Sequence, residues 1–429
     1  TRDNQFALRF RARITVDIAG NYTFATNSDD GSALLIDGEV VVDNDGLHGA
    51  RTVTAVRFLD IGTYDLEVTM FEQGGGELIE ATYAPPGGGF RAIPGGGTLA
   101  GPPDPSQTGS WGPVIPWTFV PVSAANLPDG RVITWASNER YSFPGGRPEF
   151  TYTGIWDPTD NSILEIDHPS HDMFCAHQVM LENGQVFVSG GRNSGNSPWT
   201  SVFDINTNQW VPLNNMNRGR WYPTSLALAD GTVFTAIGSG GGNTGEVYDP
   251  NTGNWNILSG INFNPVILDY PGNEYGERNW WPLFGLMPDG RVFHAGPTPQ
   301  MHIIDTEGVG SATPTGTEFT DWYPKHGTTV MFDEGKMITA GGWETGASIA
   351  STNEAHVIDL NQPSPAVTAT SPMIYPRKFH NGVMLPNGEV LVVGGNTSGQ
   401  KFNDSGTVYP VEIWNPATEN WREGAAMSV

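Results

Sequence analysis

Residues 227–238 have the sequence ALADGTVFTAIG, in which an Asp-Gly pair separates two apolar segments. Asp-Gly and Asn-Gly are the strongest local signals of a tight β-hairpin, because both central residues of such a turn adopt positive φ. Five other segments have the same form, two apolar runs around a turn glycine, and a unit repeated at this interval is the signature of a repeat architecture. The six turn glycines are 45 to 59 residues apart: Gly130, Gly184, Gly231, Gly290, Gly335 and Gly388.

A further apolar segment follows every hairpin, as in EVYDP at residues 246–250. Four short strands in about 50 residues make one blade of a β-propeller. The predicted fold class is therefore all-β, with a kelch-like β-propeller of six complete repeats over residues 117–429. Three repeats add a tryptophan soon after the third strand, at Trp210, Trp255 and Trp421.

The segment GSWGPVIPWTFVPV, residues 109–122, precedes the first repeat and resembles strand material. A ring of blades normally closes on itself, because an open ring leaves strand edges exposed to other chains. We therefore expect a seventh blade, begun by this segment and completed beyond Val429.

The chain ahead of the propeller divides into two parts. Residues 84–116 are rich in Pro and Gly and have little to bury, which predicts a linker. Residues 1–83 alternate apolar and polar residues in several short runs, such as FALRFRARITVDI, and this pattern predicts a β-sandwich.

The charge balance excludes several classes of partner. The net charge of the 429 residues is −25, so nucleic acid and anionic membranes are poor partners. No apolar run reaches the roughly 18 residues that a membrane span requires. Three acceptor sequons, at Asn21, Asn396 and Asn403, predict a glycoprotein at an extracellular or cell-surface location.

Cys175 is the only cysteine, so in a secreted protein it is either a reactive thiol or a small buried hydrophobe. His168, His171 and His177 lie close to it in the sequence. Their spacing matches no familiar zinc pattern, and solvated or hydrogen-bonded loop histidines are the simpler interpretation.

The N-terminal run GNYTFATNSDDGSALLIDGEVVVDNDG, followed by GTYDLEVTMFEQGGGELIEATY, resembles the protective-antigen-type (PA-fourteen) β-sandwich. Some members of that family bind sugars through calcium. The resemblance implies a possible calcium site at Asp29 and Asp30, whose adjacent carboxylates suit a hard cation, and carbohydrate as a partner. The same pair also occurs in members where it only forms a turn.

The propeller resembles the galactose oxidase and glyoxal oxidase family of copper radical oxidases. The matching motifs include HDMFC at 171–175, RGRWYPTSLALADGTVF at 218–234 and PRKFHNGVMLPNGEV at 376–390. The resemblance implies that Cys175 bonds through sulfur to the ring of Tyr222. The linked tyrosine would bind copper and carry a radical during the oxidation of an alcohol or aldehyde by O2, which yields H2O2. Without the resemblance, a Tyr beside a Trp in a propeller is ordinary core.

Two features depart from the family pattern. The loop that commonly carries an aromatic shield over the linked tyrosine is GSGGGN here, residues 238–243, so a shield must come from elsewhere. The family's second tyrosine and both copper histidines follow the sixth repeat, and we expect the chain to end a few residues before the Tyr-His pair.

Two functions are therefore open. The first is an extracellular copper radical oxidase whose C-terminal copper ligands lie outside this chain. The alternative is a non-catalytic cell-surface or extracellular-matrix protein that uses the same domains for carbohydrate binding, or for self-assembly through open β edges.

Overall fold

A computed structural model describes residues 6–74, 76, 78–93, 97–99, 109–142, 149–192, 196–263, 281–298, 300–319, 322–344, 350–362, 364–398 and 404–427. The chain divides into two compact units. The first comprises Thr1–Gly112 with Tyr409–Val411 and Glu423–Val429, and the second comprises Pro113–Val408 with Glu412–Arg422. The described residues form strands and turns, and none of them lies in a helix that could cross a membrane.

The first unit is a β-sandwich, as predicted. One sheet has the strand order β4-β3-β6-β1-β9 and the other β5-β2-β7-β8. The side chains between the sheets include Ile14, Tyr22 and Phe24, which are fully buried. The strands are β1 (Phe6–Val16), β2 (Gly20–Asp29), β3 (Ser32–Ile36), β4 (Glu39–Asn44), β5 (Arg51–Leu59), β6 (Gly62–Glu72), β7 (Leu78–Ala84), β8 (Arg91–Ala92) and β9 (Gly97–Leu99).

Two of these strands lie within residues 84–116, the stretch that the sequence predicted to be a linker. β8 pairs with β7, and β9 pairs in parallel with Ile14–Val16 of β1. An edge strand of two or three residues needs only backbone hydrogen bonds to a longer neighbour, so a Pro/Gly-rich segment can supply it. The sandwich sheets therefore extend to residue 99.

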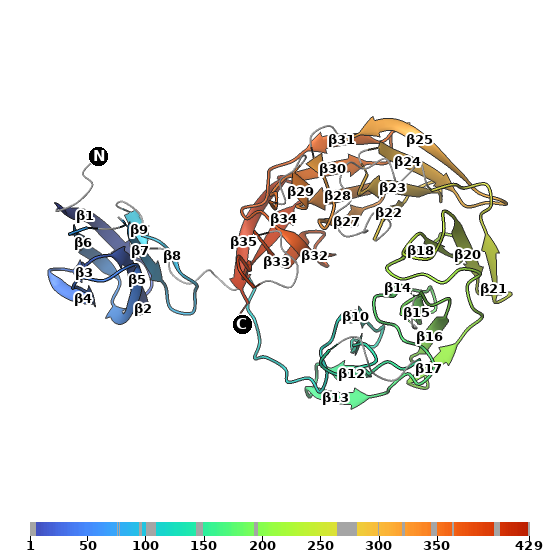
Figure 1. Cartoon of the computed structure of the whole chain (residues 1–429), viewed down its shortest axis with the longest axis horizontal. Helices are drawn as coiled ribbons and strands as arrows, with labels where there is room; N and C mark the ends of the chain where they lie inside the picture. The colour runs from blue at the N-terminus through green and yellow to red at the C-terminus, as the bar shows by residue number, and fades with distance from the viewer. Residues whose placement is uncertain are drawn as a thin grey trace. The chain divides into compact units, whose positions relative to one another are not determined.

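The second unit confirms the propeller. Six four-stranded antiparallel sheets follow one another along the described chain, one for each predicted repeat. We number these blades 1 to 6. Figure 1 shows them arranged around an axis, with the first strand of each blade nearest the centre and the fourth strand outermost. A short two-stranded sheet pairs β26 (Trp322–Tyr323) with β29 (Trp343–Glu344).

The blade strands are, in order, β10 (Ser123–Asn126), β11 (Val132–Trp135), β12 (Thr153–Asp157) and β13 (Ser162–Glu165); β14 (His177–Met180), β15 (Val186–Ser189), β16 (Thr200–Asp204) and β17 (Gln209–Pro212); β18 (Thr224–Ala227), β19 (Val233–Ala236), β20 (Gly245–Asp249) and β21 (Asn254–Ile257); β22 (Leu283–Leu286), β23 (Val292–Gly296), β24 (Gln300–Asp305) and β25 (Ser311–Glu318); β27 (Thr328–Asp333), β28 (Lys336–Ala340), β30 (Ala355–Asp359) and β31 (Ala366–Ala369); and β32 (Lys378–Met384), β33 (Val390–Asn396), β34 (Pro410–Asn415) and β35 (Asn420–Ala426).

Residues 109–122, which were expected to begin a seventh blade, contain no assigned strand. Val122 donates its backbone N–H to the carbonyl of Trp135 at 2.9 Å, so the segment leads directly into the first strand of blade 1. The seventh blade stays a prediction.

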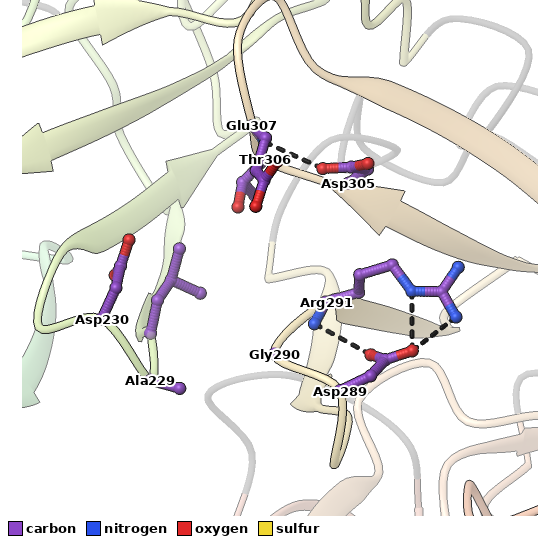
Figure 2. Close-up of a pocket in the computed structure, with 9 residues that line it drawn as sticks. Ala229, Asp230, Asp289, Gly290, Arg291, Asp305, Thr306 and Glu307 are labelled. Atoms are coloured by element: carbon purple, nitrogen blue, oxygen red, sulfur yellow. Dashed lines mark hydrogen bonds and ion pairs between the residues drawn. The ribbon is translucent and has the colours of Figure 1, made fainter.

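The first hairpin of each blade turns at its predicted glycine, which an Asp or Asn precedes in five blades and Glu334 precedes in blade 5. The Asp289 carboxylate accepts hydrogen bonds from the backbone N–H and the Nε of Arg291, at 3.1 and 2.8 Å. Figure 2 shows this turn beside Asp230 of the neighbouring blade, around a hollow of about 530 Å³ whose other walls include Glu307. Because Asp289 is held by its own turn, we assign it a structural role.

Blades 3 and 6 each contain a fully buried Arg–Glu ion pair, and we call each of these pairs a brace. In blade 3, Arg220 contacts Glu246 at 2.9 Å, and its guanidinium also donates to the carbonyl of Ile237. In blade 6, Arg377 contacts Glu412 at 2.7 Å and donates to the carbonyl of Gly394. In each blade the glutamate also accepts two backbone N–H groups from the segment just before the arginine. Glu246 accepts those of Asn217 and Arg218. Glu412 accepts those of Ile374 and Tyr375.

Candidate functional site

Five residues at the inner starts of blades 2 to 6 adopt the left-handed conformation. We call them the inner ring. None is glycine, and a non-glycine residue with positive φ is uncommon, especially when it is bulky. Their φ values lie between 49° and 60°, and they are Cys175, Tyr222, Trp281, His326 and Phe379.

Backbone hydrogen bonds join neighbouring members of the inner ring. The N–H of Tyr222 donates to the carbonyl of Cys175 at 3.0 Å, and the N–H of Trp281 donates to the carbonyl of Tyr222 at 3.2 Å. The N–H of Phe379 donates in the same way to the carbonyl of His326 at 2.9 Å. These bonds cross from one blade to the next, so they offset the strain of the left-handed residues and fix the side chains relative to one another.

The structure brings Cys175 and Tyr222 together, although the sequence separates them by one whole blade. Their side chains lie close enough that each shifts the pKa of the other. Burial raises the pKa of the Cys175 thiol to about 12, while its hydrogen bonds with Tyr222 and Trp221 act in the opposite direction. Burial, followed by the neighbouring thiol, also raises the pKa of the Tyr222 phenol. Both groups are therefore protonated at neutral pH.

Two tryptophans cover the Tyr222 ring, and they provide the shield that residues 238–243 do not. Trp221 stacks on it with ring centroids 4.4 Å apart and an interplanar angle of 25°. Trp281 packs against it at 4.3 Å and 57°. Adjacent residues in a strand normally point to opposite faces. Because Tyr222 is left-handed, that alternation is broken, and its neighbour Trp221 lies over its ring.

A buried polar group stands close to this pair. Asp172 is 2% exposed, and burial raises the pKa of its carboxyl to about 7. The N–H of Phe174 and the charge of Arg192 act in the opposite direction. The Arg192 guanidinium also lies over the Trp221 ring, 5.6 Å from its centroid, which helps to hold the shield in place.

A cavity of about 340 Å³ lies beside the other half of the inner ring. Trp281, His326 and Phe379 all line it, and the rings of His326 and Phe379 are 4.7 Å apart. The sequence analysis did not find these three residues. Aligning the repeats on their inner strands would have placed them at the positions of Cys175 and Tyr222. The remaining lining residues are Leu283, Pro297, Pro324, Lys325, Gly327, His380 and Asn381.

Two of the three histidines near Cys175 in the sequence are core residues. His168 and His171 are each about 1% exposed, and both rings bond to the hydroxyl of Ser201, at 2.8 and 2.9 Å. Burial lowers the pKa of His168 to about 3 and that of His171 to about 4. The third histidine, His177, contacts the N–H of Ser225 at 3.2 Å. The hydrogen-bonded interpretation therefore holds for all three.

The structure gives Asp30 a structural use. Its carboxylate accepts the N–H of Gln73 at 2.7 Å, which lowers its pKa, and its own N–H donates to the carbonyl of His48. The carboxylate of Asp29 lies beside Gly76. Calcium at Asp29 and Asp30 stays a prediction.

The resemblance to copper oxidases raises the question of which described side chains could hold a metal ion. No group of three His, Cys, Asp or Glu side chains close enough to hold a metal ion occurs in the described part of the chain. Tyr222 is the one family ligand that the sequence matches. Copper at Tyr222 therefore stays a prediction.

Two of the three predicted glycosylation sites lie in the described residues. Asn21 is exposed on β2. Asn396 is 8% exposed and its side-chain oxygen accepts the hydroxyl of Ser398, so a glycan there would require the side chain to leave this contact. Asn403 lies outside the described residues.

Comparisons with known proteins agree with both parts of the architecture. Residues 1–95 match the PA14 domain family and residues 181–217 match the Kelch motif. Galactose oxidase of Gibberella zeae is 34% identical over 330 residues, which cover 73% of this chain and 48% of that protein. The aldehyde oxidase GLOX of Vitis pseudoreticulata is 25% identical over 250 residues, which cover 54% of this chain and 46% of that protein. The chain thus spans about half the length of these relatives.

One solved structure that is similar to this chain contains copper. It is a fungal alcohol oxidase of the AA5 family in complex with copper, at 31% identity and a TM-score of 0.69, with 75% of this chain and 68% of that chain covered. Together with the propeller and the relatives above, this match identifies the second unit. The chain belongs to the galactose oxidase and glyoxal oxidase family of copper oxidases.

Proposed function

We propose that Cys175 and Tyr222 form the redox centre of an extracellular copper radical oxidase that oxidises a primary alcohol or aldehyde with O2. The observation that carries the proposal is the meeting of the two residues, which share a backbone hydrogen bond of 3.0 Å and whose side chains lie close enough that each shifts the pKa of the other. The two tryptophans over the phenol support it, because they limit the access of water to the ring.

The pair is suited to forming a thioether. The thiol of Cys175 would lose its hydrogen and the ring of Tyr222 one ring hydrogen, a sulfur–carbon bond would form, and the two hydrogens would pass to O2 as H2O2. A sulfur substituent donates electron density into the phenol and so lowers the cost of removing an electron. The protein would then be lighter by the mass of two hydrogens.

In the overall reaction the alcohol loses two electrons and two protons and becomes an aldehyde, and O2 gains them and becomes H2O2. Copper, when bound, supplies Lewis acidity and one-electron redox chemistry. The family resemblance places the other copper donors after the sixth repeat, so we expect them outside the described residues.

The test compares this chain with a natural chain that extends further. Both are exposed to Cu²⁺ and O2, and intact mass, free-thiol content and peroxide from a panel of alcohols and aldehydes are measured. We expect the extended chain to bind about one copper, to lose its thiol and to make peroxide, and the present chain to keep its thiol.

Two variants of the extended chain complete the experiment. Tyr222→Phe should abolish both thioether and peroxide. Cys175→Ser should bind copper and turn over poorly. If the extended chain keeps its thiol and makes no peroxide from any substrate, the oxidase is excluded in favour of the non-catalytic surface or matrix protein.

A further inference from the structure

We propose that the cavity beside the inner ring is the substrate pocket, and that it selects an alcohol or aldehyde with an aromatic or otherwise apolar skeleton over a hexose. The role of the bound molecule as a substrate rests on the proposed function. The binding itself requires neither copper nor the thioether, so the two proposals can fail separately.

The size and walls of the cavity fit a small organic molecule. Its volume of about 340 Å³ falls within the usual range for ligand pockets, which are mostly apolar with a few polar groups. Trp281 and Phe379 contribute aromatic rings, and Leu283, Pro297 and Pro324 contribute aliphatic surface. An aromatic ring of the ligand can stack on such walls and displace water from them.

The polar groups in the cavity are few. His326 is half-buried and Asn381 is exposed, and these two side chains can bond to a single hydroxyl or carbonyl oxygen. Lys325 adds one buried cationic side chain, and the buried His380 also lines the cavity, with its Nε2 already 3.2 Å from the carbonyl of Ala340. A hexose carries five hydroxyl groups, and each one desolvated without a partner costs about 1–3 kcal/mol. The cavity therefore penalises a sugar more strongly than an alcohol with one hydroxyl group.

The cavity adjoins the proposed redox centre through a shared wall. Trp281 lines the cavity and also packs against the Tyr222 ring at 4.3 Å. A molecule in the cavity would therefore contact the shield of the phenol. Among the described residues of the inner ring, Trp281 is the one that both lines the cavity and packs on the Tyr222 ring.

The backbone provides an independent argument. Trp281, His326 and Phe379 all hold positive φ, which costs of order 1–3 kcal/mol for each such residue. Strain of this kind clusters at ligand sites, and here all three strained residues line one cavity. If these positions had only a structural role, glycine could occupy them without that cost.

The experiment measures binding to the present chain without copper, by ligand-observed NMR, with benzyl alcohol, toluene and galactose as probes. We expect benzyl alcohol to bind about tenfold or more tightly than galactose, a difference equivalent to one unsatisfied polar group. Asn381→Trp, at an exposed position of the cavity wall, should weaken benzyl alcohol binding by about tenfold. Met384→Trp is the matched control, because Met384 is 50% exposed on the same strand and does not line the cavity, and it should leave binding unchanged.

His326→Asn tests the polar contact. Asparagine tolerates positive φ, so the backbone can be retained while the imidazole is lost. This variant should weaken benzyl alcohol several-fold and leave toluene, which has no hydroxyl, unaffected. Urea midpoints of all variants show which of them remain folded, and His326→Asn carries the test if Asn381→Trp does not.

Three outcomes would overturn the proposal: galactose binding as tightly as benzyl alcohol, no binding of benzyl alcohol, or equal effects of Asn381→Trp and Met384→Trp in folded proteins. Benzyl alcohol binding with loss in Asn381→Trp supports the pocket, even if the extended chain shows no oxidase activity. If the extended chain is an active oxidase and the present chain binds no benzyl alcohol, the proposed function stands and the pocket proposal is wrong.

Discussion

Blades 3 and 6 have the same framework and differ in chemistry. Each holds a buried Arg–Glu brace, and in each the residue two positions after the arginine is a left-handed member of the inner ring. In blade 3 that residue is Tyr222, and in blade 6 it is Phe379. The two side chains differ by one hydroxyl group, and that hydroxyl is the group of Tyr222 that interacts with the Cys175 thiol. The framework is thus repeated, while one side chain in each blade decides what that blade can do.

The largest expected effect comes from breaking the brace. Glu246→Leu in blade 3 and Glu412→Leu in blade 6 each leave a buried guanidinium unpaired, which should cost about 3–5 kcal/mol of unfolding free energy. Urea unfolding of the intact chain measures the cost. Arg13→Met removes an exposed pair with Asp65 in the sandwich and should cost less than about 1 kcal/mol. A small loss for only one of the two glutamate variants would show that the braces are not equivalent.

The second prediction is that acid destabilises blade 6 more than blade 3. Blade 6 contains the buried His380, whose pKa burial lowers to about 3, and the described part of blade 3 contains no histidine. The unfolded chain binds this proton below about pH 6.5, so stability is lost as the pH falls below that value. At pH 5 the loss is about 2 kcal/mol. Hydrogen exchange, corrected for intrinsic rates, should show blade 6 opening more readily at pH 5 than at pH 7.

His380→Gln provides the control for this prediction, because it removes the titrating group. If blade 3 loosens as much as blade 6 between pH 7 and 5, or if the variant keeps the full pH dependence, His380 is not the cause.

The third prediction exchanges the inner-ring side chains. Tyr222→Phe removes a hydrogen bond that lowers the pKa of the Cys175 thiol, so the pKa should rise further and alkylation should slow several-fold. Phe379→Tyr introduces a phenol on the other side of the inner ring and should leave the alkylation rate unchanged. The rate of reaction with iodoacetamide between pH 8 and 10 measures both. Faster alkylation of Tyr222→Phe would show that exposure of the thiol outweighs the lost hydrogen bond.

The smallest effect is expected at the hairpin turns of the two blades. The Asp230 carboxylate accepts the N–H of Thr232 at 2.9 Å, and the Asn387 side chain accepts the N–H of Glu389 at 3.1 Å. Asp230→Ala and Asn387→Ala should each cost about 0.5–1 kcal/mol, since the freed groups are reached by water. Thermal unfolding measures the change, and a cost above that of a brace variant would contradict the assigned role.

The sequence by itself determined the repeated part of the fold. The turn glycines define the hairpins locally, because all six hold positive φ, which glycine adopts without steric cost, whereas the residue before each of them does not have positive φ. The interval between them defines the blade, and the single Cys175, through its matching surroundings, indicated where the proposed redox centre lies. The short strands β8 and β9 were missed, since their stability comes from the partner strands and not from their own composition.

Only the tertiary structure decided the composition of the site. Cys175 and Tyr222 meet because two blades place their inner ends side by side, and this distance cannot be obtained from local pattern alone. The left-handed backbone at Tyr222 reverses the expected alternation and lays Trp221 on its ring. Trp281, His326 and Phe379 come from three separate blades, and each is an ordinary strand-flanking residue in the sequence. Propensity acts within a few residues, whereas the inner ring forms across blades about 50 residues apart, so packing between the blades decides which side chains share a cavity.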